Sequence, residues 1–209
     1  MEKKNVVIQK FRDVLMKHYN RTVDVMDKVD AIRADIEAKR GTAMQYTASQ
    51  SSAMVREAIR PLEDELPGMV KQIDNLMDAV RNALAKKYEL RGEEVSPDLQ
   101  LLTGAFDLSS EKLKELNQRH RDNPTMSTAI KTYANKHGIS PVGFSFRDQA
   151  SEEQVYNSMA GQARHWMGRM TSGIEEPAAR AMLSFANNFG TTMAPEQTEI
   201  IGDGAGLLQ

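Results

Sequence analysis

The stretch RHRDNPTM, residues 119–126, has the residue order closest to a catalytic motif in this chain. Its His-Arg-Asp, residues 120–122, spells the start of a protein-kinase catalytic loop, in which an Asn five residues after the Asp binds magnesium. Ser127 stands at that Asn position, and neither a D-F-G sequence nor a preceding Gly-rich phosphate loop is present. We therefore interpret the stretch as the junction of two helices, with Asn123 as N-cap and Pro124 at the first helical position.

Other residue types that could hold a metal or a nucleotide lack the spacing that such sites need. The histidines share no H-E-x-x-H or similar ligand spacing; they are His18, His120, His137 and His165. The glycines of GDGAG, residues 202–206, mimic a dinucleotide fingerprint without the strand and helix that should flank it. Acidic residues at 63–65 and 175–176 lie beside prolines at expected helix starts, where the helix dipole favours negative charge. We predict no catalytic residue, no metal and no cofactor, hence a protein that is not an enzyme.

Composition argues against a nucleic-acid-binding, a disulfide-bonded and a membrane-spanning protein. The chain has 209 residues, enough to bury a core, and its 27 Lys and Arg nearly balance 29 Asp and Glu. It therefore lacks the basic excess that drives binding to a phosphate backbone. The absence of cysteine excludes disulfides and thiolate chemistry, and 13 methionines with 6% aromatics suit helices better than sheets. No signal-peptide run and no stretch of the ~20 apolar residues that a membrane helix needs is found, so we expect a soluble protein without a membrane partner.

Apolar residues recur at steps of three and four over residues 7–36, which predicts a long amphipathic helix ending before Gly41. At about 35 residues, or about 50 Å, this helix exceeds the ~40 Å diameter of a compact domain of this length, so we expect it to project or to lie along a partner. His18 falls on the stripe and is interpreted as a polar residue that sets the register of a helix seam. The predicted interaction seam consists of Phe11, Val14, His18, Val25, Val29, Ile32 and Ile36.

A second apolar stripe runs from Met44 to Val80 and keeps its phase across Pro61 and Pro67. Either one continuous helix is kinked at the prolines, or a proline occupies the first turn of a new helix. Because an interior proline costs about 3 kcal/mol, we favour a break or sharp bend over residues 61–68. With the first helix, this stripe predicts a long, coiled-coil-like helical hairpin over residues 1–92.

The rest of the chain predicts a small multi-helix bundle over residues 96–190 and a flexible, extended tail over 191–209. Expected helices cover about 97–105, 109–121, 123–138, 151–170 and 175–188. Ser151 and Gln154 form an expected capping box, and Gly138 an expected helix end. Only residues 139–149 alternate like a strand, which fits an ordered loop, an edge pairing with another chain or a segment that closes over the small helices. The predicted fold class is all-α.

Residues 162–170, QARHWMGRM, offer a different interpretation. Arg164, Arg169 and Trp166 could contact a single nucleic-acid strand, as could the basic residues at 119–121. Trp166 on a Met-rich helix is more often a core residue, and we keep it as a candidate for interaction. The alternative function is thus a nucleic-acid-associated accessory protein, whose binding should collapse between low and moderate salt.

The segment SPDLQLLTGAFDLSSEKLKELNQRHRDNPTMSTAIKTYANKHG, residues 96–138, resembles a segment of uncharacterised helical proteins encoded by phages and prophages of Gram-positive bacteria. The shared pattern covers about a fifth of the chain. It falls on packing and capping residues, namely Leu101, Leu102, Gly104, Leu108, Leu113, Leu116, Asn123, Met126, Ile130 and Tyr133. The resemblance implies a small helical fold and a setting in virion structure or head morphogenesis, without an active site.

Together these inferences predict a non-enzymatic structural or assembly protein of a phage particle, which acts through helix-mediated self-association. Expected partners are a second copy of the chain and capsid, portal or other virion proteins, with nucleic acid not favoured. The expected location is the bacterial cytoplasm during assembly, with the virion as an alternative destination.

Overall fold

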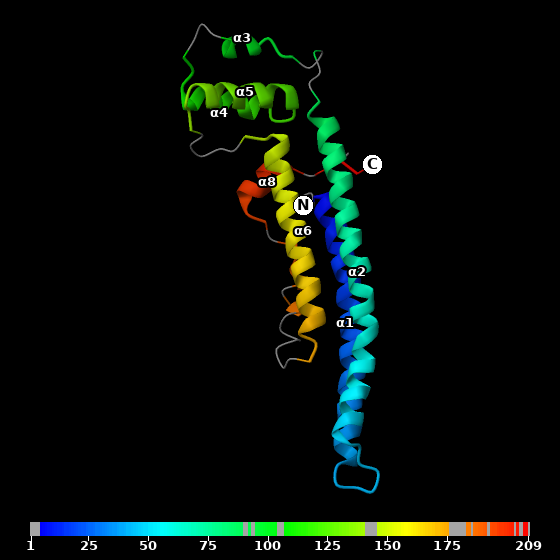
Figure 1. Cartoon of the computed structure of the whole chain (residues 1–209). Helices are drawn as coiled ribbons and strands as arrows, with labels where there is room; N and C mark the ends of the chain where they lie inside the picture. The colour runs from blue at the N-terminus through cyan, green and yellow to red at the C-terminus, as the bar shows by residue number, and fades with distance from the viewer. Residues whose placement is uncertain are drawn as a thin grey trace. The chain divides into compact units, whose positions relative to one another are not determined.

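The chain is described here by a computed structural model that covers residues 5–89, 92, 95–103, 107–140, 146–175, 183–184, 186–191, 193–202, 204 and 207–208. Every regular element in these residues is a helix, which confirms the all-α prediction (Figure 1). The helices are α1 Val6–Lys39, α2 Ala48–Lys87, α3 Leu99–Leu102, α4 Ser110–Arg119, α5 Pro124–Lys136, α6 Gln149–Ser172 and α8 Pro195–Ile201. The predicted hairpin is present, because the two long helices α1 and α2 pack against each other.

Spatial contacts divide the chain into two compact units. Unit 1 combines residues 1–8, 77–158 and 193–209, and unit 2 combines residues 9–76 and 159–192. Each of α1, α2 and α6 contributes residues to both units. The division predicted above followed composition along the chain, whereas this grouping joins segments that are distant in sequence. The predicted domains stay a prediction.

The ends of α1 follow local rules. Asn5 caps its first turn, because its Oδ1 accepts hydrogen bonds from the backbone N–H groups of Val7 and Ile8, at 3.0 and 3.1 Å. The helix ends at Lys39, a cation in the last turn, and Gly41 follows with φ of +73°, a conformation that glycine adopts without strain. The predicted end of the first helix is confirmed.

The favoured break in the second helix is wrong, because α2 continues through both Pro61 and Pro67. Each proline lies on the exposed face of the helix, as do Glu57 and Glu63, whose carbonyls would otherwise accept its N–H. Water can satisfy these carbonyls, so a proline on this face loses less than one inside a core. The apolar stripe continues on the opposite face, where its buried residues include Ile59, Leu62, Met69 and Ile73.

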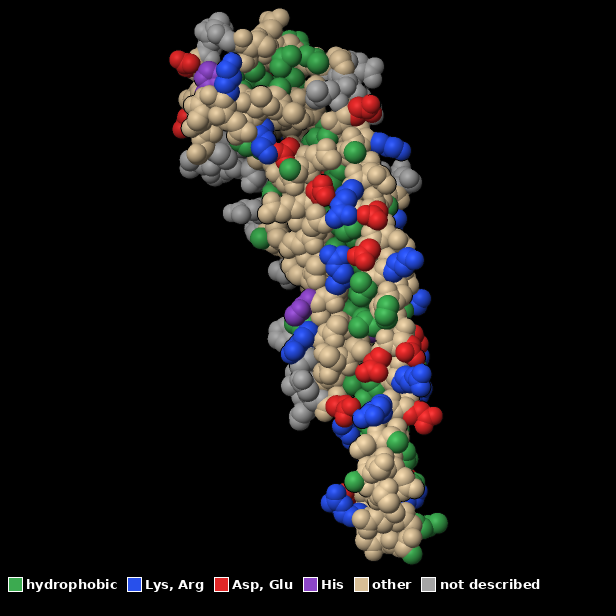
Figure 2. Space-filling model, viewed as in Figure 1, with side chains coloured by type: hydrophobic (Ala, Val, Ile, Leu, Met, Phe, Trp, Pro, Cys, Tyr) green, Lys and Arg blue, Asp and Glu red, His purple; other side chains and the backbone are tan. Residues whose placement is uncertain are grey.

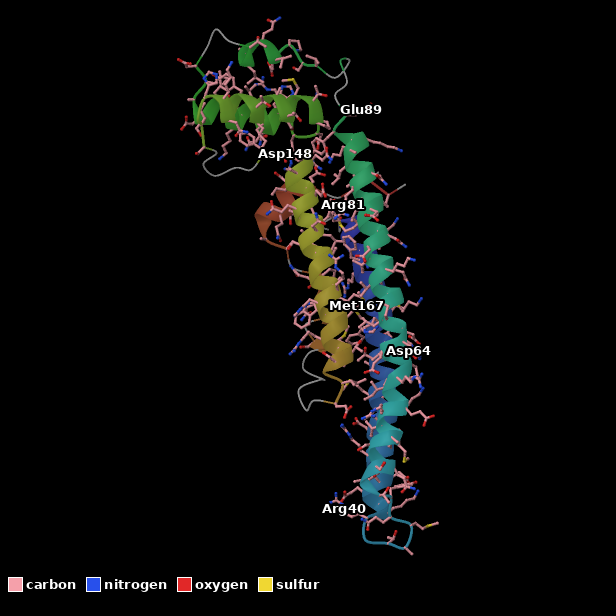
Figure 3. All side chains as sticks on the ribbon, viewed as in Figure 1. Arg40, Asp64, Arg81, Glu89, Asp148 and Met167 are labelled. Atoms are coloured by element: carbon pink, nitrogen blue, oxygen red, sulfur yellow. The ribbon has the colours of Figure 1, made fainter. Side chains whose placement is uncertain are left out.

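In unit 2, α1 and α2 pack with the second half of α6 around an apolar core. The residues that form it are all buried, namely Phe11, Leu15, Val25, Met26, Val29, Ile59, Leu62, Met69, Ile73, Met159, Ala163, Met167 and Met170. Five of these are methionines, whose flexible side chains fill irregular gaps between helices. Met167 lies on α6, and the hairpin continues beyond the end of that helix (Figure 3).

In unit 1, α4 and α5 pack around a cluster of Leu113, Leu116, Ile130, Tyr133, Ala134 and Phe146, with Leu101 and Leu102 of α3 against it. Ser109 caps α4 through the Lys112 N–H, at 3.3 Å. Asn123 caps α5 through the Met126 N–H, at 3.0 Å, and Pro124 opens that helix. The prediction that residues 119–126 join two helices is confirmed.

Two expectations about local structure are wrong. The helix α6 begins at Gln149, before the predicted capping box, because Asp148 supplies the cap and its Oδ1 accepts from the Ser151 N–H at 2.7 Å. The tail is not simply extended, because it contains α8, and Ile201 and Leu207 are buried. Residues 141–145 of the strand-like stretch, and most of the helix expected over 175–188, lie outside the described residues.

Candidate interaction surface

The predicted interaction seam divides into a covered part and a partly exposed part. Phe11, His18, Val25 and Val29 are buried inside unit 2, at 2% exposure or less. These side chains cannot meet a second chain while the unit stays closed. The other seam residues, Val14, Ile32 and Ile36, are half-buried, as is Trp166 on α6.

The buried part of the seam on α1 ends where α6 ends. The last α1 residue in the core is Val29, and the next buried hydrophobic residue along the chain is Ile59 on α2. Glu175, just after α6, forms an ion pair with Arg33 at 4.0 Å, which places the end of α6 beside that turn of α1. The rest of the hairpin, residues 34–57, extends beyond the end of α6 (Figure 1).

Apolar side chains continue along this part of the hairpin without becoming buried. Together with Ile32, one turn before Ile36, we call them the tip surface, formed by Ile32, Ile36, Met44, Met54 and Val55. Four of the five are half-buried on α1 and α2, and Met44 in the connecting loop is 75% exposed. Hydrophobic atoms are visible at the loop end of the hairpin in Figure 2. Large exposed apolar patches mark interaction sites, which makes the tip surface a candidate for one.

Charged residues at the end of α1, beside the tip surface, are paired within the hairpin. Lys39 bonds Asp35 at 2.9 Å and also contacts the Tyr46 hydroxyl at 2.6 Å, while Tyr46 donates to Asp35 at 2.9 Å. These hydrogen bonds lower the pKa of the Asp35 carboxyl and raise that of the Lys39 ammonium. Further along, Arg40 pairs with Glu37 at 3.3 Å. The charges near the tip therefore offset one another and select no strongly charged partner.

His18 is the one ionisable residue on the covered seam. Its side chain is 0% exposed, and its Nε2 lies 2.9 Å from the Thr171 hydroxyl of α6. Burial lowers the pKa of the imidazole below its ordinary value, and the Met167 carbonyl and the Glu65 carboxylate oppose that shift only in part. The ring is therefore held uncharged between two helices of unit 2.

Three of the basic residues of the alternative interpretation, Arg119, His120 and Arg164, have acidic partners. Arg119 and His120 both bond Asp98, each at 2.8 Å, and these bonds lower the pKa of that carboxyl. Arg164 pairs with Asp74 at 2.5 Å. Cations that are already paired offer less to a phosphate backbone than free ones, since binding would have to break these pairs.

The residues most like a reactive centre were not found by sequence reasoning. In unit 1, the Glu152 carboxylate is 0% exposed and receives three cationic or hydroxyl donors on one oxygen. Its Oε1 accepts from Lys87 Nζ at 2.6 Å, Arg147 Nε at 2.7 Å and the Tyr88 hydroxyl at 2.8 Å. Lys87 also reaches Oε2 at 2.8 Å, and Arg147 Nη1 bonds Asp122 at 3.1 Å.

This Glu152 cluster has the chemistry of a structural support. Burial lowers the pKa of Lys87 even though Glu152 opposes the shift, and burial together with the Glu152 charge raises the pKa of Tyr88. Burial alone would lower the pKa of Arg147, but the charge and hydrogen bond of Glu152 raise it. Both carboxylate oxygens are occupied by groups of the chain itself, so a reactant would have to displace one of them. No local pattern marks the cluster, because its members come from separate segments of the chain.

Two further searches of the described residues gave negative results. No group of three His, Asp or Glu side chains there is placed to hold a metal ion. None of the helices in that part of the chain combines the length and the apolar character needed to cross a bilayer. Comparison with protein families, with curated proteins and with solved structures finds no match to this chain.

Proposed function

We propose that this protein is a non-enzymatic assembly protein whose tip surface binds the tip surface of a second copy. The observation that carries this proposal is that the apolar side chains of the α1–α2 hairpin continue past the end of α6, the helix that covers them elsewhere. α6 supplies a third helix up to Arg33, and beyond that turn the described chain leaves Ile36 and Val55 only half-buried. A second hairpin would supply the missing helices and complete a four-helix arrangement.

A second copy fits this surface better than a strongly charged partner does. The nearby charges are paired within the hairpin, as in Lys39–Asp35 and Arg40–Glu37, so the surface carries both signs close together. Symmetric pairing of one apolar patch with itself is the commonest way in which a protein forms a dimer. The resemblance of residues 96–138 to phage-encoded helical proteins supplies the proposed setting, which is virion or head morphogenesis with capsid or portal subunits as further partners.

The test is the mass of the full-length chain in solution, measured by light scattering and sedimentation at two protein and two salt concentrations. We expect a dimer whose mass is insensitive to salt, because apolar burial drives it. Met44→Asp and Val55→Asp should shift the chain to monomer. The first of these changes a side chain that is 75% exposed, so it should not disturb the fold.

The matched control is Ala53→Asp, which adds the same charge to an exposed position of α2 two residues from Val55. It should leave the dimer intact. A wild-type chain that stays monomeric at every concentration contradicts the proposal, and so does a dimer that neither Met44→Asp nor Val55→Asp weakens.

A further inference from the structure

His18 stands in unit 2 with one ring nitrogen bonded and the other without a partner. The Thr171 hydroxyl donates to the Met167 carbonyl at 3.0 Å, so its hydrogen is already used. With the hydroxyl hydrogen on Met167, its oxygen accepts from His18 Nε2, 2.9 Å away, and we assign the ring proton to Nε2 on this basis. Nδ1 is therefore a bare acceptor, and it is buried without a hydrogen-bond partner in the described part of the chain.

The surroundings of His18 offer little to a charged ring. From α6 it meets Thr171 and the Met167 backbone, which are polar but uncharged. From α2 the nearest carboxylate is Glu65, which Arg21 of α1 holds in a two-point pair at 2.6 and 3.0 Å. Lys17, also on α1, lies near the same carboxylate. Glu65, the carboxylate that raises the pKa of the ring, is thus shared with Arg21.

Protonation of His18 would place an N–H⁺ at Nδ1, which is buried without a hydrogen-bond partner in the described part of the chain. A buried charge without a partner is far less stable than the same charge in water, so the closed packing disfavours the protonated ring. Water or a nearby carboxylate could reach Nδ1 only if the helices around it separate. Proton uptake and helix separation are therefore linked.

We propose that His18 is a proton-sensitive latch of unit 2: uptake of a proton by its ring parts α6 from α1 at the Thr171 contact. Opening would uncover the seam residues Phe11, Val25 and Val29, which the closed unit buries. The latch is a property of one chain and does not depend on binding of a second copy at the tip surface.

The sign and size of the effect follow from linkage. The pKa of His18 in the closed unit lies below its ordinary value of about 6.5. The closed unit is therefore most stable above about pH 6.5, and it loses stability as the pH falls below that value. One proton taken up on opening raises the opening equilibrium constant by at most about tenfold per pH unit, so His18 can contribute at most about thirtyfold between pH 7.5 and pH 5.0.

The experiment is urea unfolding of the full-length chain between pH 7.5 and pH 5.0, followed by the fluorescence of Trp166. This residue is the only tryptophan and lies on α6 next to Met167. We expect the unfolding constant to rise more in the wild type than in His18→Leu over this range, with a difference of at most about thirtyfold, because only the wild type takes up the His18 proton on unfolding. His165→Leu is the matched control, because it makes the same change at an exposed position of the same helix, and it should keep the wild-type dependence.

A second measurement uses the wild-type protein alone, so it tests the proposal even if His18→Leu fails to fold. In the wild-type protein, the NMR resonance of the His18 ring is expected to titrate at a lower pH than an ordinary histidine for as long as the chain stays folded. A His18 resonance that titrates near pH 6.5 in the closed protein overturns the proposal. Equal pH dependence of wild type and His18→Leu overturns it as well.

Discussion

At the scale of single residues, the most consequential side chain of unit 1 is Glu152. Two cations, Lys87 and Arg147, bond this one carboxylate. The Lys87 side chain is only 27% exposed and the Arg147 side chain only 14%. An ion pair of this kind adds little net stability over apolar packing, because each charge must leave water. Removal of the Glu152 charge alone is strongly destabilising, because it would leave two largely buried cations facing each other.

We therefore expect Glu152→Gln to lower the free energy of unfolding by about 3–5 kcal/mol. Urea unfolding followed by circular dichroism measures this change. The matched control is Glu153→Gln at the next residue, which pairs with Arg81 at 3.0 Å with both side chains at least 30% exposed (Arg81 is labelled in Figure 3). That variant should change the free energy by less than about 1 kcal/mol. Equal effects of the two variants would contradict a structural role for the Glu152 cluster.

At the scale of elements, α2 shows how exposure decides the effect of a proline. Pro61 and Pro67 both lie on the outer face of a helix of 40 residues, where their missing hydrogen bonds fall on solvent-facing carbonyls. The buried face of the same turns carries Leu62 and Met69, which hold the helix against α1. Burial along that face offsets the cost of the prolines, so the helix continues.

Replacement of Pro61 by Ala should stabilise the protein, by up to about 3 kcal/mol, because it restores an interior hydrogen bond and removes a ring clash. Thermal and urea unfolding of the variant measure the gain. Pro124→Ala provides the contrast, since Pro124 occupies the first turn of α5, where no hydrogen bond is lost, and no gain is expected. A Pro61→Ala variant that gains nothing would indicate a helix start at that position.

At the scale of the whole molecule, unit 1 draws together the beginning, the middle and the end of the chain. Asn5 joins them, because its side chain caps α1, donates to the Tyr156 hydroxyl at 3.2 Å and donates to the Gly202 carbonyl at 3.1 Å. Arg147 also donates to the Ile201 carbonyl, at 3.3 Å. Gly204 has φ of +63°, and a Cβ there would lie 2.8 Å from the Asn5 amide, so only glycine fits. The end of the chain is thus a packed part of unit 1.

Ile201→Ala tests this arrangement. Ile201 is 0% exposed, so the truncation should lower the free energy of unfolding by about 2–5 kcal/mol, as expected for a core residue. Thr198→Ala, at an exposed position of the same helix, should change it by less than about 0.5 kcal/mol. Both are measured by urea unfolding of the full-length chain. Two variants that unfold at the same urea concentration would show that the tail does not contribute to the core.

Local sequence predicts most of the described helices and several of their ends, although it missed α8 and the start of α6. The apolar stripe of α1, the cap at Asn123 and the left-handed conformation of Gly41 depend on interactions within a few residues. The residue types next to one another in the sequence are therefore enough to predict them. The same local logic excluded a kinase motif at residues 120–122, because the residues needed around it were absent.

Other features depend on contacts between distant segments, and only the folded chain reveals them. These include the continuity of α2 through its prolines, the burial of Glu152 among Lys87, Tyr88 and Arg147, and the seating of the tail on Asn5. In each case a local preference competes with burial against residues far away in the sequence. Burial is summed over many contacts, so it overrides a local cost of a few kcal/mol, and no periodicity reveals which segments will meet.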